Sequence, residues 1–234
     1  MNELPSESAP EVAPDSVFQI WTRALTKPSE HTYAALASSP RAKATTAYIW
    51  MFVASLIQFL LSSLVQRQMI ENFRLYGFDV SWLGPRAGIG AILVSLICVA
   101  PILAALSTLM FAVVVAIVQW LARMFGGTGT NDQLAYAMAA IAAPLTILSG
   151  ILSLLGAIPY AGFCFGLIGF LVGIYILVLQ LLAIKGVNRI GWGGALGAYF
   201  IPVLVLGFLC ACLTGVSLAA LIPVFRETVP GFRP

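Results

Sequence analysis

Five stretches of the sequence run for about twenty residues or more without one Asp, Glu, Lys, Arg or His. A helix of about 20 apolar residues rises roughly 30 Å, which is the thickness of the hydrocarbon core of a bilayer. Only helices and closed barrels satisfy their backbone polar groups inside that core. The sequence therefore predicts an all-α, polytopic membrane helix bundle with about five transmembrane helices. The expected membrane domain is 45–222, with spans over 45–65, 88–122, 133–156, 160–184 and 194–221.

The second of these runs differs from the others in length. It is too long for one level crossing of a bilayer, yet no polar turn divides it into two. We expect a single long helix that is kinked near Pro101 or begins there, because proline has no backbone N–H to donate. Residues 88–100 either lie in the bilayer as part of a tilted helix or lie outside it.

Charged residues are scarce in this chain. They make up 9% of the 234 residues, whereas 60% are hydrophobic, and an ordinary soluble domain has about 25% charged residues. The formal net charge of +3 is spread over several loops, with no basic stripe of the kind that neutralises a phosphate backbone. The composition predicts the lipid bilayer as the main partner and excludes nucleic acid.

The polar segments at the two ends of the chain differ in character. Residues 1–14 are rich in Pro, Ser, Glu and Ala, and they contain too little apolar surface to offset the entropy of ordering them. We expect a disordered tail there, followed by a cytosolic helical lead-in over 15–44. Residues 223–234 are expected to form a short C-terminal tail.

The first helix of the lead-in is predicted to be amphipathic, with Asp15 or Ser16 as its N-cap. If its apolar face lies on the membrane, Trp21 is an interfacial anchor at the level of the headgroups, and Arg23 and Lys27 lie near anionic lipid. Docking of the same face on the protein's own helix bundle is an equally good alternative.

Basic residues next to the spans predict the orientation, because they are enriched on the cytoplasmic side. With the N-terminus inside, the basic residues facing the cytoplasm are Arg41, Lys43, Arg123, Lys185 and Arg189, and those facing outside are Arg67, Arg74, Arg86 and Arg226. The larger first group favours a cytoplasmic N-terminus. An odd number of spans then places the C-terminus on the extracytoplasmic side.

No set of residues suits catalysis, cofactor binding or metal binding. The spans contain no ionisable residue of the kind that ion-coupled carriers use at membrane depth. His31 is the only histidine and lies in a polar region, where a solvated side chain is the simplest interpretation. The four cysteines lie within apolar runs and behave as small hydrophobes; they are Cys98, Cys164, Cys210 and Cys212. We therefore expect no enzyme activity and no cofactor.

Glycine and proline carry more information. Small residues spaced four apart let membrane helices approach closely, and three such pairs occur in the last two spans. They are Gly162 with Gly166, Gly169 with Gly173, and Gly193 with Gly197. Packing within the bundle is the favoured interpretation, and a homodimer seam is the alternative. Helix kinks are expected at Pro101, Pro144 and Pro202.

The stretch from Phe125 to Leu206 resembles the Yip1 domain, a five-span membrane fold of bacteria and of the eukaryotic secretory pathway. The resemblance consists of ordered features. They are the loop Gly126 to Gln133, Ala143-Pro144, the turn Ile158-Pro159, the glycine-rich fourth span, the loop Lys185 to Gly191, and Phe200-Ile201-Pro202.

The lead-in also fits this family. Trp21, Lys27-Pro28, Tyr33 and Leu36 are similar to the segment that precedes the first span in bacterial members. The D-L-Y-G type signature of eukaryotic members is absent, so a bacterial-type member in the inner membrane is the better fit.

The resemblance implies a non-enzymatic membrane protein, because eukaryotic relatives bind small GTPases and help shape or sort transport membranes. A small GTPase is thus a partner by family resemblance alone. The function we expect is a membrane scaffold or adaptor that recruits a protein partner at its cytoplasmic face, with a role in membrane trafficking or organisation. The alternative is a small permease or channel, in which proline-broken helices expose carbonyls to a substrate path.

Overall fold

The structure is a computed structural model, and it describes residues 16–75, 95–156, 162–205, 207–208 and 211–212. Within these ranges every regular element is a helix, which confirms the all-α prediction. The elements are α1 (Val17–Thr26), α2 (Glu30–Ala37), α3 (Ala44–Leu75), the π-helical turn η2 (Ser95–Val99), α5 (Ala100–Met124), α6 (Asn131–Gly156), α7 (Gly162–Asn188) and a C-terminal helix (Trp192–Val205).

Four helices are long and apolar enough to cross a membrane, which makes the chain a multi-pass membrane protein. Their apolar spans are Ala44–Ser63, Ile97–Met124, Asn131–Gly156 and Cys164–Asn188, and the C-terminal helix Trp192–Val205 is apolar but shorter. Several predicted segments lie outside the described residues. They are most of the part of the fifth span after residue 205, the expected tails 1–14 and 223–234, and residues 88–94 of the second run.

The second apolar run enters its helix through η2 and continues without a break into α5. Pro101 lies in the first turn of α5. Pro101 therefore marks the start of α5, one of the two placements expected for it.

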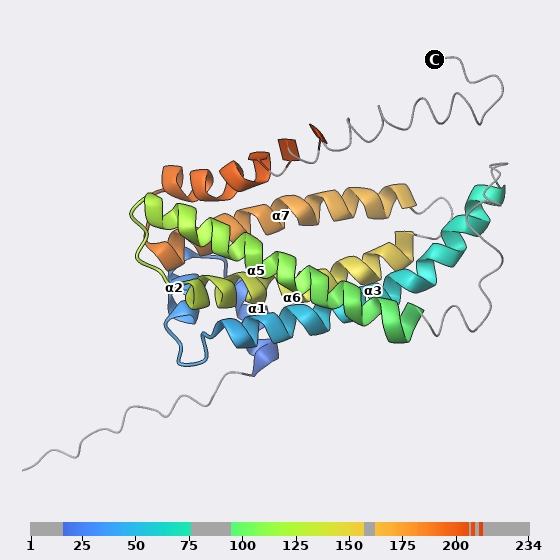
Figure 1. The fold of residues 1–234 in the computed structure, drawn as a ribbon, viewed down its shortest axis with the longest axis horizontal. Coiled ribbons are helices and arrows are strands. Elements are labelled where there is room, and N and C mark those ends of the chain that lie inside the picture. The colour runs from blue at the N-terminus through green and yellow to red at the C-terminus, as the bar shows by residue number, and fades with distance from the viewer. Residues whose placement is uncertain (1–15, 76–94, 157–161, 206, 209–210, 213–234) are drawn as a thin grey trace, which may run out of the picture.

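Helix α6 is the centre of the bundle, and it contacts α1, α2, α3, α5 and α7. Every residue from Leu134 to Ile141 is buried, and four of these eight residues are alanines. Small side chains on all sides of one helix let several neighbours approach it closely. Figure 1 shows α6 running between α3 and α7 along the length of the bundle.

The outer faces of α5 and α7 present large apolar side chains that no other part of the described chain covers. They are Ile102, Leu106, Leu109, Met110, Val113 and Trp120 on α5, and Leu167, Ile168, Phe170, Leu171 and Ile174 on α7. Such a large apolar surface would be unstable in water. It is the surface that lipid chains cover.

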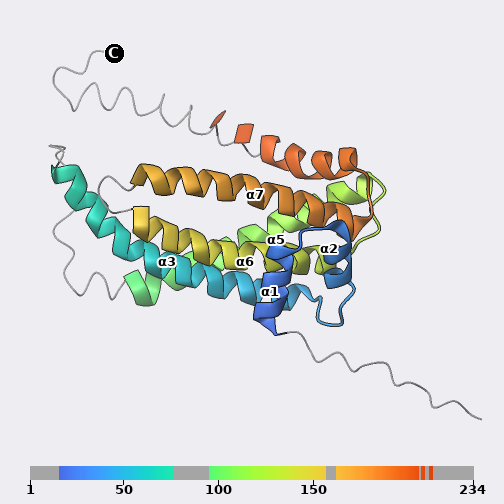
Figure 2. The same ribbon diagram turned by 180° about the vertical axis from the view of Figure 1, so that it is seen from behind.

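The lead-in helices α1 and α2 pack at one end of the bundle. In Figure 2, α1 runs across the direction of the spanning helices, near the start of α3 and the end of α7. The same end holds the connection between α5 and α6 and the residues that follow α7. We call this region the lead-in end.

Candidate functional site at the lead-in end

Helices α1 and α2 form a closed pair. Ser16 caps α1 with a capping box, in which its hydroxyl accepts from Gln19 N and the Gln19 side chain accepts from Ser16 N. The fully buried Tyr33 of α2 donates its hydroxyl to Ala24 O at 2.7 Å. Burial, and secondarily the nearby Tyr175, raises the pKa of Tyr33. Its hydroxyl therefore stays protonated and remains a hydrogen-bond donor.

Helix α7 holds this pair on the bundle. Lys185 Nζ lies 2.6 Å from a carboxylate oxygen of Glu30, and Tyr175 donates its hydroxyl to Leu25 O at 2.5 Å. Gly186 lies directly against the backbone of Glu30, at a distance that leaves no room for a side chain. Lys185 also lies 4.8 Å from the centre of the Trp192 ring, which ties the C-terminal helix to the same point.

The Glu30 to Lys185 ion pair makes stability depend on pH. The hydrogen bond from Lys185, and next its charge, lowers the pKa of Glu30 below its ordinary value. The stabilisation is therefore present above the ordinary carboxyl pKa and is lost as the pH falls through the lowered one. Wild type should melt about 1 to 2 °C above Glu30→Gln at pH 7, and the difference should shrink as the pH falls below the ordinary carboxyl pKa. High salt should reduce it too, and an undiminished difference at pH 3 would contradict this origin.

The connection between α5 and α6 is anchored by two buried amides. Gln119 of α5 donates through Nε2 to Gly129 O at 2.6 Å and to Asn188 Oδ1 at 2.9 Å. Asn188, at the end of α7, donates to Ile184 O, and its own carbonyl accepts from Thr128 N. Both amide side chains are almost fully buried. Three segments far apart in the sequence thus share one polar network.

Two glycines in this connection are required by their neighbours. A Cβ on Gly127 would meet Ala122 O at 2.7 Å, and one on Gly129 would meet Asn188 Oδ1 at 2.8 Å. Gly126 precedes them with a φ of +86°, a conformation that suits glycine. The glycine-rich composition of this loop therefore follows from its close approach to α5 and α7.

Trp21 lies at the contact between α1 and the bundle. Its ring meets Trp50 edge-on, with centroids 5.9 Å apart, and Trp50 lies against Tyr136 with centroids 5.0 Å apart. Ile20 and Ala24 of the same helix are buried, whereas Arg23 and Lys27 are exposed. Of the two arrangements considered from the sequence, the structure has α1 docked on the bundle. The interfacial role of Trp21, Arg23 and Lys27 stays a prediction.

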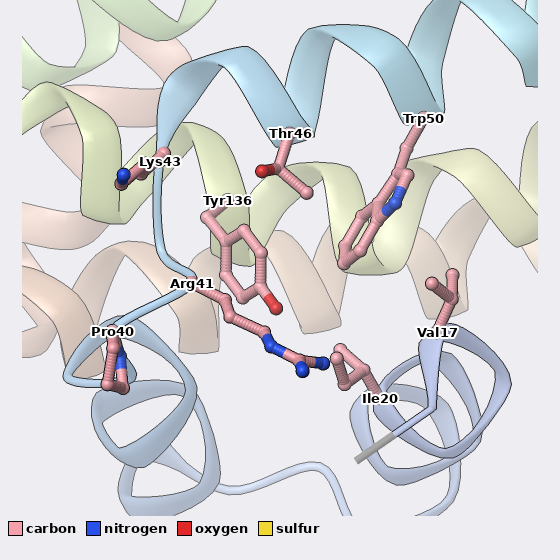
Figure 3. Close-up of a pocket in the computed structure, with 8 residues that line it drawn as sticks. All are labelled: Val17, Ile20, Pro40, Arg41, Lys43, Thr46, Trp50 and Tyr136. Carbon is pink, nitrogen blue, oxygen red and sulfur yellow. The ribbon is translucent and has the colours of Figure 1, made fainter. Parts of the chain in front are cut away.

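A pocket of about 320 Å³ opens beside this aromatic contact (Figure 3). We call it the α1–α3 pocket. Its lining comes from α1, from the connection before α3, from the first turns of α3 and from α6: Val17, Ile20, Pro40, Arg41, Lys43, Thr46, Trp50 and Tyr136. Figure 3 shows the Arg41 side chain reaching across it towards Ile20, below the hydroxyl of Tyr136. No motif in the sequence indicates this pocket, because its residues come from three separate segments.

The surface of the lead-in end is basic and rich in large apolar side chains. The exposed basic residues here are Arg23, Lys27, Arg41, Lys43, Arg123 and Arg189, and the exposed large apolar residues are Phe18, Met124, Phe125 and Trp192. In the described part of this end, fewer acidic residues than basic residues are exposed. Among the described residues, no three His, Cys, Asp or Glu side chains gather as metal ligands.

The glycines expected to lie at helix contacts differ in whether another part of the described chain lies against them. Gly197 lies against the Phe125 ring, which a Cβ would approach to 2.8 Å. Gly166, Gly169, Gly173 and Gly193 have no atom of the described chain within 4 Å of the position of a Cβ. Gly162 is the first residue of α7. In the described monomer Gly166, Gly169 and Gly173 of α7 thus face open surface, and a homodimer seam there stays a prediction.

Two of the prolines considered for a substrate path, and the polar Gln58 of α3, lie within the described helices. Pro144 lies inside α6 and Pro202 is buried in the C-terminal helix. Gln58 donates to Ser149 Oγ at 3.2 Å, between α3 and α6. A hydrogen bond between helices is the packing role expected of a polar residue at membrane depth.

The most important contacts of this end were not identified from the sequence. Four of the residues that make these contacts belong to no catalytic or binding motif, and their roles depend on neighbours distant in the sequence. They are Glu30, Tyr33, Tyr175 and Gly186. Asn188 carried a weak signal, because it is a polar residue at the last turn of a long apolar helix.

Comparison with known proteins finds a matching family model. The sequence profile of the Yip1 domain matches residues 22–214, a range that includes most of the lead-in and all four spans. No curated protein and no solved structure matches the chain significantly. The match therefore covers the bundle, α2 and the second half of α1.

Proposed function

Because the chain belongs to the Yip1 domain family, we propose that it is a non-enzymatic membrane scaffold whose lead-in end recruits a protein partner. The lead-in end then presents a platform at the membrane surface, and the bundle holds the platform in the bilayer. A role in membrane trafficking or organisation follows from such recruitment.

The observation that carries this proposal is that the lead-in end is assembled in advance. Glu30, Tyr175, Gln119 and Asn188 hold α1, α2 and the loop before α6 through contacts made within the chain. A surface that is already ordered loses less entropy when a partner binds. Exposed arginine and aromatic side chains, such as Arg123 and Trp192, are the types enriched where proteins bind each other.

The basic residues of the lead-in end support a cytoplasmic location for the platform. Those next to the spans at this end are Arg41, Lys43, Arg123, Lys185 and Arg189, and such residues are enriched on the cytoplasmic side. The N-terminus is then cytoplasmic, and with five spans the C-terminus is extracytoplasmic. For a bacterial-type member the membrane is the inner one.

Charge reversal tests the platform. We expect Arg123→Glu with Arg189→Glu to reduce the partner recovered by crosslinking in cells and copurification by about tenfold, because an acidic partner surface would then be repelled. The matched control is Arg67→Glu with Arg74→Glu, which makes the same change of charge at the other end of α3. Both variants should keep the melting temperature of wild type within about 3 °C.

The outcome that would remove the basis for the platform is equally specific. If both double variants copurify the same partners in the same amounts as wild type, the basic surface of the lead-in end does not recruit them. A small GTPase, the partner implied by eukaryotic relatives, is one candidate to be looked for among the recovered proteins.

A further inference from the structure

We propose that the α1–α3 pocket binds the phosphate headgroup of an anionic phospholipid. The ligand is a lipid of the surrounding membrane, held with its phosphate in the pocket and its acyl chains beside α3. This site is separate from the surface of Arg123 and Arg189 and does not depend on the scaffold proposal.

The chemistry of the lining suits a phosphate. Two cations, Arg41 and Lys43, line the pocket, and none of the eight lining residues is acidic. A guanidinium matches phosphate oxygens with two parallel hydrogen bonds, and an ammonium adds a point charge. Thr46 and Tyr136 add hydroxyl groups to the same lining. The Tyr136 side chain is 1% exposed and packs against Trp50.

The start of α3 strengthens the positive potential. Lys43 immediately precedes α3. A lysine side chain cannot accept a hydrogen bond, so it does not cap the first N–H groups of the helix. The dipole of the helix places partial positive charge at the same point. Figure 3 shows the Arg41 guanidinium in the pocket and the Lys43 ammonium pointing away from it, so an anion there would contact Arg41 and gain longer-range attraction from Lys43 and the start of the 32-residue α3.

The depth of the pocket indicates a lipid and not a soluble anion. The apolar span of α3 begins at Ala44, so Lys43 and Thr46 lie where the hydrocarbon core ends and the headgroups begin. Val17 lines the pocket and is itself 44% exposed. The pocket therefore combines cationic groups with an apolar edge at the membrane surface, which a phospholipid matches and a free phosphate does not.

An apolar path continues from the pocket into the bilayer. Ile49 and Val53 follow Thr46 on the same side of α3, one and two turns deeper, as the helical repeat of 3.6 residues requires. Both are exposed, at 58% and 46%, and both are apolar. Acyl chains that run along them would bury this surface while the phosphate stays with Arg41 and Lys43.

Native mass spectrometry of the full chain in detergent provides the test, with dioleoyl phosphatidylglycerol, dioleoyl phosphatidylcholine and inorganic phosphate as probes. Wild type should retain one phosphatidylglycerol at least about tenfold better than phosphatidylcholine, because only the former carries net charge. Arg41→Gln with Lys43→Gln should abolish that preference. The matched control, Arg23→Gln with Lys27→Gln, removes equal charge from exposed positions of α1 outside the pocket and should keep the preference within twofold.

A second variant guards against a folding defect in the first. Thr46→Phe fills the pocket without changing charge and should also abolish retention, whereas Arg41→Lys with Lys43→Arg keeps both charges and should retain the lipid. Equal retention of phosphatidylcholine, equal loss in the α1 control, or retention of lipid by Thr46→Phe would each overturn the proposal. Binding of inorganic phosphate with no preference for the lipid would assign the pocket to a soluble anion and overturn it as well.

Discussion

Replacing Gly186 by Ala is expected to lower the free energy of unfolding by about 2 kcal/mol. The new Cβ would collide with the backbone carbonyl of Glu30, and a backbone atom in a packed helix cannot move aside as a flexible side chain does. The collision forces α2 away from α7 and breaks the ion pair to Lys185. Thermal melting in mild detergent measures the loss, and faster trypsin cleavage after the exposed Arg23 reports release of the lead-in.

The matched control for this substitution lies in the same helix. Gly173 has no atom of the described chain within 4 Å of its Cβ position, so Gly173→Ala meets no obstacle there. The change should be neutral or stabilising by up to about 1 kcal/mol, because alanine favours helix more than glycine does. If both substitutions shift the melting temperature equally, the contact between Gly186 and Glu30 does not hold the lead-in.

Replacing Asn188 by Leu is expected to cost about 2 kcal/mol. The change keeps the approximate volume of the side chain but removes the acceptor of Gln119 Nε2 and the donor to Ile184 O. The buried Gln119 is then left with Gly129 O alone, and an unsatisfied buried amide is expensive. Thermal melting of the single variant measures this cost.

A double variant separates the network from simple packing. When both partners become apolar, neither amide is left unsatisfied, so Gln119→Leu with Asn188→Leu should cost about 1 kcal/mol less than the sum of the single changes. Gln180→Leu serves as the control in α7, because its side chain makes no hydrogen bond with the described residues. Strictly additive losses would show that the two amides act independently.

The architecture was predictable because the membrane imposes it. A run without charges and long enough to cross a bilayer has to be helical, and the described part of the chain is all-helical, with four helices long and apolar enough to cross. The cap at Ser16 was predictable for a similar reason, since only a few side chains satisfy the first N–H groups of a helix. In both cases the local sequence contains the whole physical cause.

The glycines show why the site was less predictable than the spans. A pattern of small residues indicates that another helix can approach closely, but it does not indicate which helix does so. Gly166 and Gly173 fit the pattern and face open surface in the described monomer, whereas Gly127 and Gly186 fit no pattern and lie against backbone. The neighbours that decide between them come from distant segments, and one sequence does not identify those neighbours.

The contact between Tyr175 and Leu25 has a consequence for the order of synthesis. These residues are 150 positions apart in the chain, and ribosomes add about 5–20 residues per second. Helix α1 is therefore made roughly 8 to 30 seconds before the helix that holds it in place. During that interval α1 and α2 carry their apolar faces without their final neighbour. The nascent lead-in is then open to proteases and chaperones that the finished protein excludes, and quality control has its best opportunity before α7 is complete.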